Sequence, residues 1–243
     1  MVIEGAFYKL PDYFLSEETP QLSYEGQLIS YFTLAIFLEL QNRGIANPFL
    51  NIQLEKRYSK VNPKAKNKWV DIFVDVPWLE SSSSESKKAL TANYYHIFRE
   101  NWVEVKFFGG IERAEEREKR GGKKGAETTT ENVGRILDNL LRLKFYLPSN
   151  CGKYFLVGFN RSPKKYLAFR KRDYLKQLFK PGTHEIEFDV SKEPKSLKEK
   201  LSEDLRSKQK FKLKILTLAI EPEGVFSLPD RPCFWFYLIK IFE

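Results

Sequence analysis

The sequence predicts an α/β protein in which a mixed central sheet is flanked by helices. Segments 68–76 and 101–108 alternate apolar with other residues, as strands do, and segments 22–43 and 128–141 repeat apolar residues at helical spacing. A third observation is their order along the chain, which is helix, three strands, helix, strand. Because a helix between two strands is typical of a crossover connection, the last strand is expected to lie parallel to a neighbour.

The two helices of this core have recognisable ends. The first is predicted at residues 22–43, and Gly44 stands where a left-handed residue often ends a helix. Its apolar stripe contains Ile29, Phe32 and Ile36. The second helix is predicted to open at a capping box formed by Thr128 and Glu131. Its apolar stripe contains Val133, Ile136, Leu137, Leu140 and Leu141. Each stripe predicts a helix that packs one face on the sheet.

The core strands are predicted at residues 49–58, 68–76, 101–108 and 152–160. The long loop between the second and third strands contains the serine-rich run 81–86, and a short helix is expected at residues 89–99. These elements form a predicted core of residues 1–165.

Residues 166–243 are predicted to add a helix and further strands to this core. The helix is expected at residues 166–179, and the strands at residues 185–190, 211–220 and 233–242. The strands are apolar enough either to extend the main sheet or to form a small subdomain beside it.

Carboxylates set into two apolar strands are the most informative feature of the chain. Successive side chains of a strand point to opposite faces. One face of these strands is expected to be apolar, with Val70, Ile72, Val74 and Val76 in one strand and Val103, Val105 and Phe107 in the other. The opposite face carries Asp71 in the first strand, and Glu104 and Lys106 in the second. If the strands are neighbours, these three side chains form one cluster.

Such a cluster is typical of a metal-dependent phosphodiesterase site. Mg²⁺ is bound by one or two carboxylates together with water and phosphate oxygens, and a nearby lysine can hold a phosphate or orient the attacking water. Asp71, Glu104 and Lys106 supply these groups.

At these residues the chain resembles the PD-(D/E)xK nuclease superfamily, which has the restriction-endonuclease-like fold. Asp71 matches the first acid of the family pattern, and Glu104-Val105-Lys106 matches its second half, whereas Val70 stands where the family has proline. The resemblance covers roughly residues 22–160. It implies the core of helix, three strands, helix and strand, and an endonuclease that hydrolyses DNA in restriction, repair or defence and leaves 5'-phosphate ends.

The resemblance also implies the role of each site residue. Asp71, Glu104 and the Val105 carbonyl would hold Mg²⁺, for which Mn²⁺ would substitute, and Lys106 would place or deprotonate the water. A glutamate of the first helix often joins the metal site in this family, and Glu25 is the expected residue, which would complete the acidic shell of the metal or hold a metal-bound water. The catalytic set is therefore Asp71, Glu104, Lys106 and Glu25. Two alternatives stay open, since Glu39 lies on the same stripe as Glu25 and Asp75 lies on the same strand face as Asp71.

The charge of the chain favours a polyanionic partner. The net charge is +9, and lysine and arginine that neutralise phosphates release condensed counterions. The run 112–125 leaves the third core strand and would close over a nucleic-acid backbone. Candidate contacts in this run and in the helix at 166–179 are Lys119, Arg120, Lys123, Lys124, Arg170 and Arg172. DNA is the expected partner, RNA stays an alternative, and a homodimer is consistent with cleavage of both strands.

Composition excludes several other classes of protein. No apolar run is long enough to span a bilayer, so that a cytoplasmic protein without membrane contact is expected. With only two cysteines, neither a disulfide framework nor a zinc site of repeated cysteine pairs is supported. The alternatives to the nuclease are a non-catalytic nucleic-acid-binding module on the same fold, and a scaffold domain whose Glu104 and Lys106 lie on a solvated sheet face.

Overall fold

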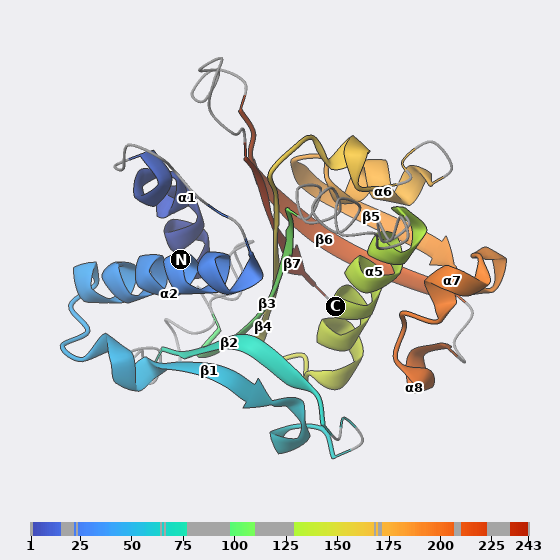
Figure 1. Ribbon diagram of the computed structural model, residues 1–243. Helices are drawn as coiled ribbons and strands as arrows, with labels where there is room; N and C mark the ends of the chain where they lie inside the picture. The colour runs from blue at the N-terminus through green and yellow to red at the C-terminus, as the bar shows by residue number, and fades with distance from the viewer. Residues whose placement is uncertain are drawn as a thin grey trace, which may run out of the picture.

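The computed structural model describes residues 2–15, 22, 24–63, 65, 67–76, 98–109, 129–167, 169, 172–206, 210–222 and 234–242. Within these residues the strands form one sheet of seven, in the order β1-β2-β3-β4-β7-β6-β5 (Figure 1). The strands are β1 (Ile52–Arg57), β2 (Trp69–Asp75), β3 (Glu100–Phe108), β4 (Gly152–Phe159), β5 (Gly182–Asp189), β6 (Lys210–Ile220) and β7 (Trp235–Ile241). Among the described strands only β3 and β4 pair in parallel, so the sheet is mixed.

Helices cover both faces of the sheet, with α1 (Val2–Leu15) and α2 (Glu25–Asn42) on one face and α5 (Thr129–Tyr146) on the other (Figure 1). The shorter helices are α6 (Asp173–Leu178), α7 (Lys195–Lys198) and α8 (Glu203–Arg206). The single-turn 3₁₀ helices are η1 (Pro48–Asn51), η2 (Tyr58–Lys60), η4 (Pro163–Lys165) and η6 (Val190–Lys192). Each face has its own apolar core, one around α5 and one around α1 and α2. None of the helices in the described ranges is long and apolar enough to cross a membrane.

The predicted fold class is confirmed. The described elements follow the expected order, with helix α2, strands β1 to β3, helix α5 and strand β4. Strand β4 lies parallel to β3, as a crossover through α5 requires. The three later strands continue the same sheet, because β7 pairs with β4 and in turn carries β6 and β5.

Three local predictions are corrected. Helix α1 was not expected; it contains Pro11, which weakens the helical pattern of the sequence, yet it packs against α2 through a buried face. The first part of the predicted strand at 49–58 is instead the 3₁₀ helix η1, which begins at Pro48. The helix predicted at 166–179 is reduced to α6, with η4 before it. The predicted helix at 89–99 lies outside the described residues except for its last two, and Thr128 of the capping box lies outside them as well.

Strand β2 changes its orientation at Asp71, so the predicted aliphatic row is interrupted. Ile72 and Val74 pack in the core with α1 and α2, whereas Val70 packs in the core with α5. In β1, Glu55 lies between the residues paired with Ile72 and Val70, and its backbone is left-handed with φ of 53°. Such irregular residues in a strand increase twist and redirect neighbouring side chains.

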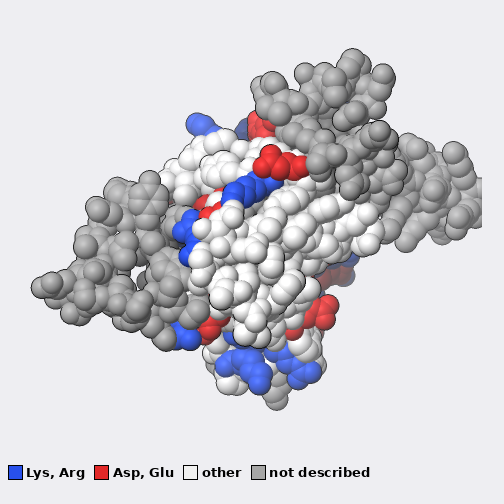
Figure 2. Space-filling view, turned by 90° about the vertical axis from the view of Figure 1, so that its left-hand side faces the viewer, with Lys and Arg blue, Asp and Glu red and all other residues white. Residues whose placement is uncertain are grey.

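The basic charge of the chain is unevenly distributed. The face formed by α1, α2 and the η1–β1 segment has a broad uncharged area in its middle (Figure 2). Exposed apolar side chains on these elements are Leu34, Phe49, Leu50 and Leu54. A nucleic-acid backbone is not expected to bind to this area, because the area presents no lysine or arginine to its phosphates.

Candidate active site

Strands β2 and β3 separate at the position of the predicted acids. Their pairing runs from Asp75 opposite Glu100 to Ile72 opposite Val103, and Asp71 follows where the pairing ends. From this point the edge of β3 that faces β2 needs other hydrogen-bond acceptors, because a buried backbone N–H without a partner is costly. The separation therefore opens a gap in the sheet.

Two carboxylates provide these acceptors. Asp71 Oδ2 accepts a hydrogen bond from the Val105 N–H, with an N···O distance of 2.6 Å. Glu25 Oε2, from the first turn of α2, accepts from the Phe107 N–H at 3.2 Å. The N–H and C=O of one strand residue point to the same side, so the Val105 carbonyl also points toward β2. Two acids and a carbonyl oxygen therefore line the gap.

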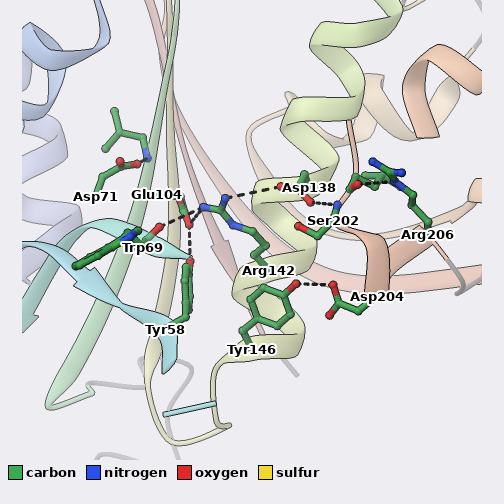
Figure 3. A network of polar contacts seen from close by, with 12 residues as sticks. Tyr58, Trp69, Asp71, Glu104, Asp138, Arg142, Tyr146, Ser202, Asp204 and Arg206 are labelled. Atoms are coloured by element: carbon green, nitrogen blue, oxygen red, sulfur yellow. Dashed lines mark hydrogen bonds and ion pairs between the residues drawn. The ribbon is translucent and has the colours of Figure 1, made fainter. Parts of the chain in front are cut away.

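Glu104 lies deeper than the other acids and is held by two donors. Its side chain is only 3% exposed. The Tyr58 hydroxyl donates to Glu104 Oε1 at 2.5 Å, and Arg142 of α5 donates to the same oxygen. Figure 3 shows Glu104 and Arg142 pointing toward each other between β3 and α5. Glu104 is therefore buried but paired, as a carboxylate in a core must be.

Asp71 is strongly perturbed by its surroundings. The pKa of its carboxyl group is raised to about 8, first by burial and next by the nearby negative charge of Glu104, while the hydrogen bond from the Val105 N–H lowers it. The charge of Glu25 and a hydrogen bond with Glu104 also raise this pKa. A buried carboxyl group beside a second carboxylate favours either its protonated form or a bound cation.

Lys106 lies at the more open side of the gap. Its ammonium group contacts Glu25 Oε2 at 2.6 Å, and the two side chains are 21% and 35% exposed. The four predicted catalytic residues are thus brought together, with Asp71 beside Glu104 and Lys106 beside Glu25. Glu25 lies between Lys106 and the pair of Asp71 and Glu104, because it contacts Lys106 and its charge raises the pKa of Asp71.

The two alternative acids lie elsewhere. Glu39 forms ion pairs with Lys9 of α1 and Arg43, each at 2.7 Å, so it joins the two helices. Asp75 pairs with Arg99 at 2.9 Å. Neither acid shares a contact with Glu104.

One predicted nucleic-acid contact is corrected. Arg172 is buried, with a side chain that is 6% exposed, and its guanidinium forms an ion pair with Glu193 at 2.7 Å. An arginine held in this way supports the fold around α6 and is not presented to a ligand. The other predicted cations, Lys119, Arg120, Lys123, Lys124 and Arg170, lie outside the described residues.

Two residues of the site were missed by the sequence analysis, Tyr58 and Arg142. A signal for Arg142 exists in the sequence, because Asp138 precedes it by one helical turn and a charged pair beside an apolar stripe suggests a buried ion pair. The two groups lie 3.7 Å apart. Tyr58 has no such signal, since it follows the strand without any pattern of its own.

The residues at the gap fit a hard divalent cation. Within the ranges that the structure describes, no three His, Cys, Asp or Glu side chains are grouped so that they could hold a metal ion. Asp71, Glu104 and the Val105 carbonyl nevertheless supply the one or two carboxylates and the oxygen that Mg²⁺ takes from proteins, the rest being water and phosphate. In this arrangement Glu25 is the partner of Lys106 rather than a third carboxylate ligand.

Comparison of the chain with models of protein families, with curated proteins and with solved structures found no match.

Replacement of Arg142 by methionine is expected to destabilise the protein by about 3–5 kcal/mol, because it leaves the Glu104 carboxylate buried without its counter-ion. Urea denaturation would measure this loss. Arg99→Met is the control, since it removes an arginine from an exposed pair with Asp75 and should change stability much less. Equal losses in the two variants would contradict the role of Arg142.

Proposed function

We propose that the protein is a metal-dependent endonuclease that hydrolyses phosphodiester bonds in DNA and acts in the cytoplasm. One observation carries the proposal: Asp71 and Glu104, from neighbouring strands, meet in a gap of the sheet where the pKa of Asp71 is raised to about 8. Like charges are brought together in this way where a cation or a proton is needed. The resemblance to the PD-(D/E)xK superfamily rests on these same residues and is the second support.

The residues divide the work according to their positions. Asp71, Glu104 and the Val105 carbonyl would hold the ion, which when bound would polarise the phosphate and lower the pKa of a water molecule. Lys106 is partly exposed and would contact the phosphate or the attacking water. Glu25 holds the Lys106 ammonium in place and accepts the Phe107 N–H, so it fixes the lysine relative to β3.

The net charge of +9 supports a nucleic-acid substrate. A non-catalytic nucleic-acid-binding module is the second candidate, and a specific observation favours it. Asp71 and Glu25 each accept a backbone N–H of β3, so both have a structural use that needs no metal.

A cleavage assay separates these two functions. Plasmid, single-stranded and branched DNA, with RNA of matched sequence, would be incubated with the protein in Mg²⁺, in Mn²⁺ and in EDTA. We expect cleavage of DNA with either ion and none in EDTA. Binding that weakens as salt increases, without cleavage at saturating Mg²⁺ or Mn²⁺, would establish the binding module instead.

A further inference from the structure

Two buried donors bind the same oxygen of the Glu104 carboxylate. The hydroxyl of Tyr58 and the guanidinium of Arg142 both donate to Oε1, and neither donates to Oε2. The donors come from different elements, Tyr58 from η2 after β1 and Arg142 from α5. Two donors on one oxygen fix the rotation of the carboxylate, and with it the direction of Oε2.

Tyr58 is itself held rigidly. Its side chain is fully buried, its ring stacks on Trp102 with centroids 5.7 Å apart, and its edge meets Tyr146. Its backbone N–H donates to the Lys68 carbonyl at 3.0 Å, next to the start of β2. Burial and the charge of Glu104 raise the pKa of the Tyr58 hydroxyl, so it keeps its proton and remains a donor.

Arg142 is tied to both strands that carry the acids. Besides Glu104 of β3, its Nη2 lies 3.4 Å from the carbonyl of Trp69, two residues before Asp71 in β2. Behind it, Asp138 receives the Ser202 N–H at 2.7 Å and lies 3.7 Å from the Arg142 guanidinium. Figure 3 shows this chain of contacts running from Glu104 through Arg142 and Asp138 to Ser202.

We propose that Tyr58 and Arg142 are positioning residues that hold Glu104 Oε1 so that Oε2 is presented to the metal beside Asp71. The inference rests on the proposed function. Groups that bind a metal ligand from behind set its orientation, and their loss typically lowers metal affinity or activity by 10–100-fold. Tyr58 and Arg142 occupy this place relative to Glu104, and neither is expected to touch the substrate.

The test compares two variants that each remove a single buried tyrosine hydroxyl. Tyr58→Phe removes the donor to Glu104, and Tyr146→Phe removes a donor to Asp204, 2.8 Å away, without touching Glu104. Binding of Mn²⁺ to the full chain would be measured by isothermal titration calorimetry, and plasmid cleavage would be measured as a function of Mg²⁺ concentration. We expect Tyr58→Phe to weaken Mn²⁺ binding by about 10–100-fold, and its cleavage to recover at saturating Mg²⁺. Tyr146→Phe should match the wild type in both measurements.

Circular dichroism would establish that each variant is folded. If Tyr58→Phe does not fold, the variant Arg142→Lys tests the positioning role instead. It keeps the positive charge but lacks the guanidinium group that contacts both Glu104 and the Trp69 carbonyl. It should weaken Mn²⁺ binding in the same direction. A wild type that binds Mn²⁺ and cuts DNA, with a folded Tyr58→Phe variant that behaves like Tyr146→Phe, would overturn the positioning role alone. A wild type that neither binds Mn²⁺ nor cuts would overturn the proposed function, and this inference with it.

Discussion

Replacing Lys106 or Asp71 by alanine is expected to lower the rate of DNA cleavage by about a thousand-fold or more, while the protein remains folded. Removal of one preorganised charge-stabilising group at a reacting centre typically costs about 10²–10³ in rate, and loss of a metal ligand removes the ion as well. Lys106 is the only one of the two that would act directly on the phosphate or the water. Initial rates on supercoiled plasmid in Mg²⁺ would measure both losses, beside the wild-type protein.

Two control variants accompany these measurements. Asp75→Ala removes a carboxylate from the same strand, four residues from Asp71, where it pairs with Arg99. Lys176→Ala removes an exposed lysine of α6. Both should cut at the wild-type rate. If Lys106→Ala or Asp71→Ala also cuts at that rate, the residue concerned has no part in the mechanism.

The stability of the metal-free protein is expected to fall as the pH rises from about 4 to about 8. The pKa of Asp71 is about 8 in the folded protein and close to 3.9 in an unfolded chain, so between these values only the folded state holds the proton. The stabilisation is complete below the lower value and is lost as the pH passes the upper one. The free energy of unfolding should decrease by up to about 1.4 kcal/mol per pH unit within this window.

Urea denaturation at a series of pH values, in EDTA, would measure this dependence. Asp71→Asn is the matched variant, because it keeps the size of the side chain but cannot ionise. This variant should lose most of the dependence of the unfolding free energy on pH. Near pH 8, which is about the pKa of Asp71 in the folded protein, it should be more stable than the wild type. Identical pH profiles for the two proteins would show that Asp71 is not the titrating group.

The meeting of Asp71 and Glu104 could be predicted from the sequence because it depends on short-range rules. Alternation and strand order predict that the two acids are neighbours on adjacent strands. They do not predict that the pairing ends at Ile72, so that the Asp71 side chain accepts the Val105 N–H at the edge of β3. The same reasoning gave α2, α5 and the order of the core elements, since each depends on a local periodicity. Helix α1 is the exception, because Pro11 interrupts its pattern and its packing against α2 decides its conformation.

The contacts around Glu104 could not be predicted in this way. Tyr58 and Arg142 lie 46 and 38 residues from Glu104 in the chain, and no local periodicity relates residues that are so far apart. The position of Val70 in the α5 core also escaped the strand pattern, because alternation assumes regular strands and the neighbouring strand is irregular at Glu55. Arg172 has the positive charge that a phosphate contact needs, but only the fold shows that this side chain forms an ion pair with Glu193.

The backbone of Glu55 has a second consequence, for the solubility of the protein. Strand β1 ends the sheet, and an outermost strand is a template on which another chain can build amyloid-like or swapped assemblies. The left-handed backbone at Glu55 interrupts the regular row of main-chain groups along this strand. A second copy of β1 would therefore meet an irregular partner at this point of the edge.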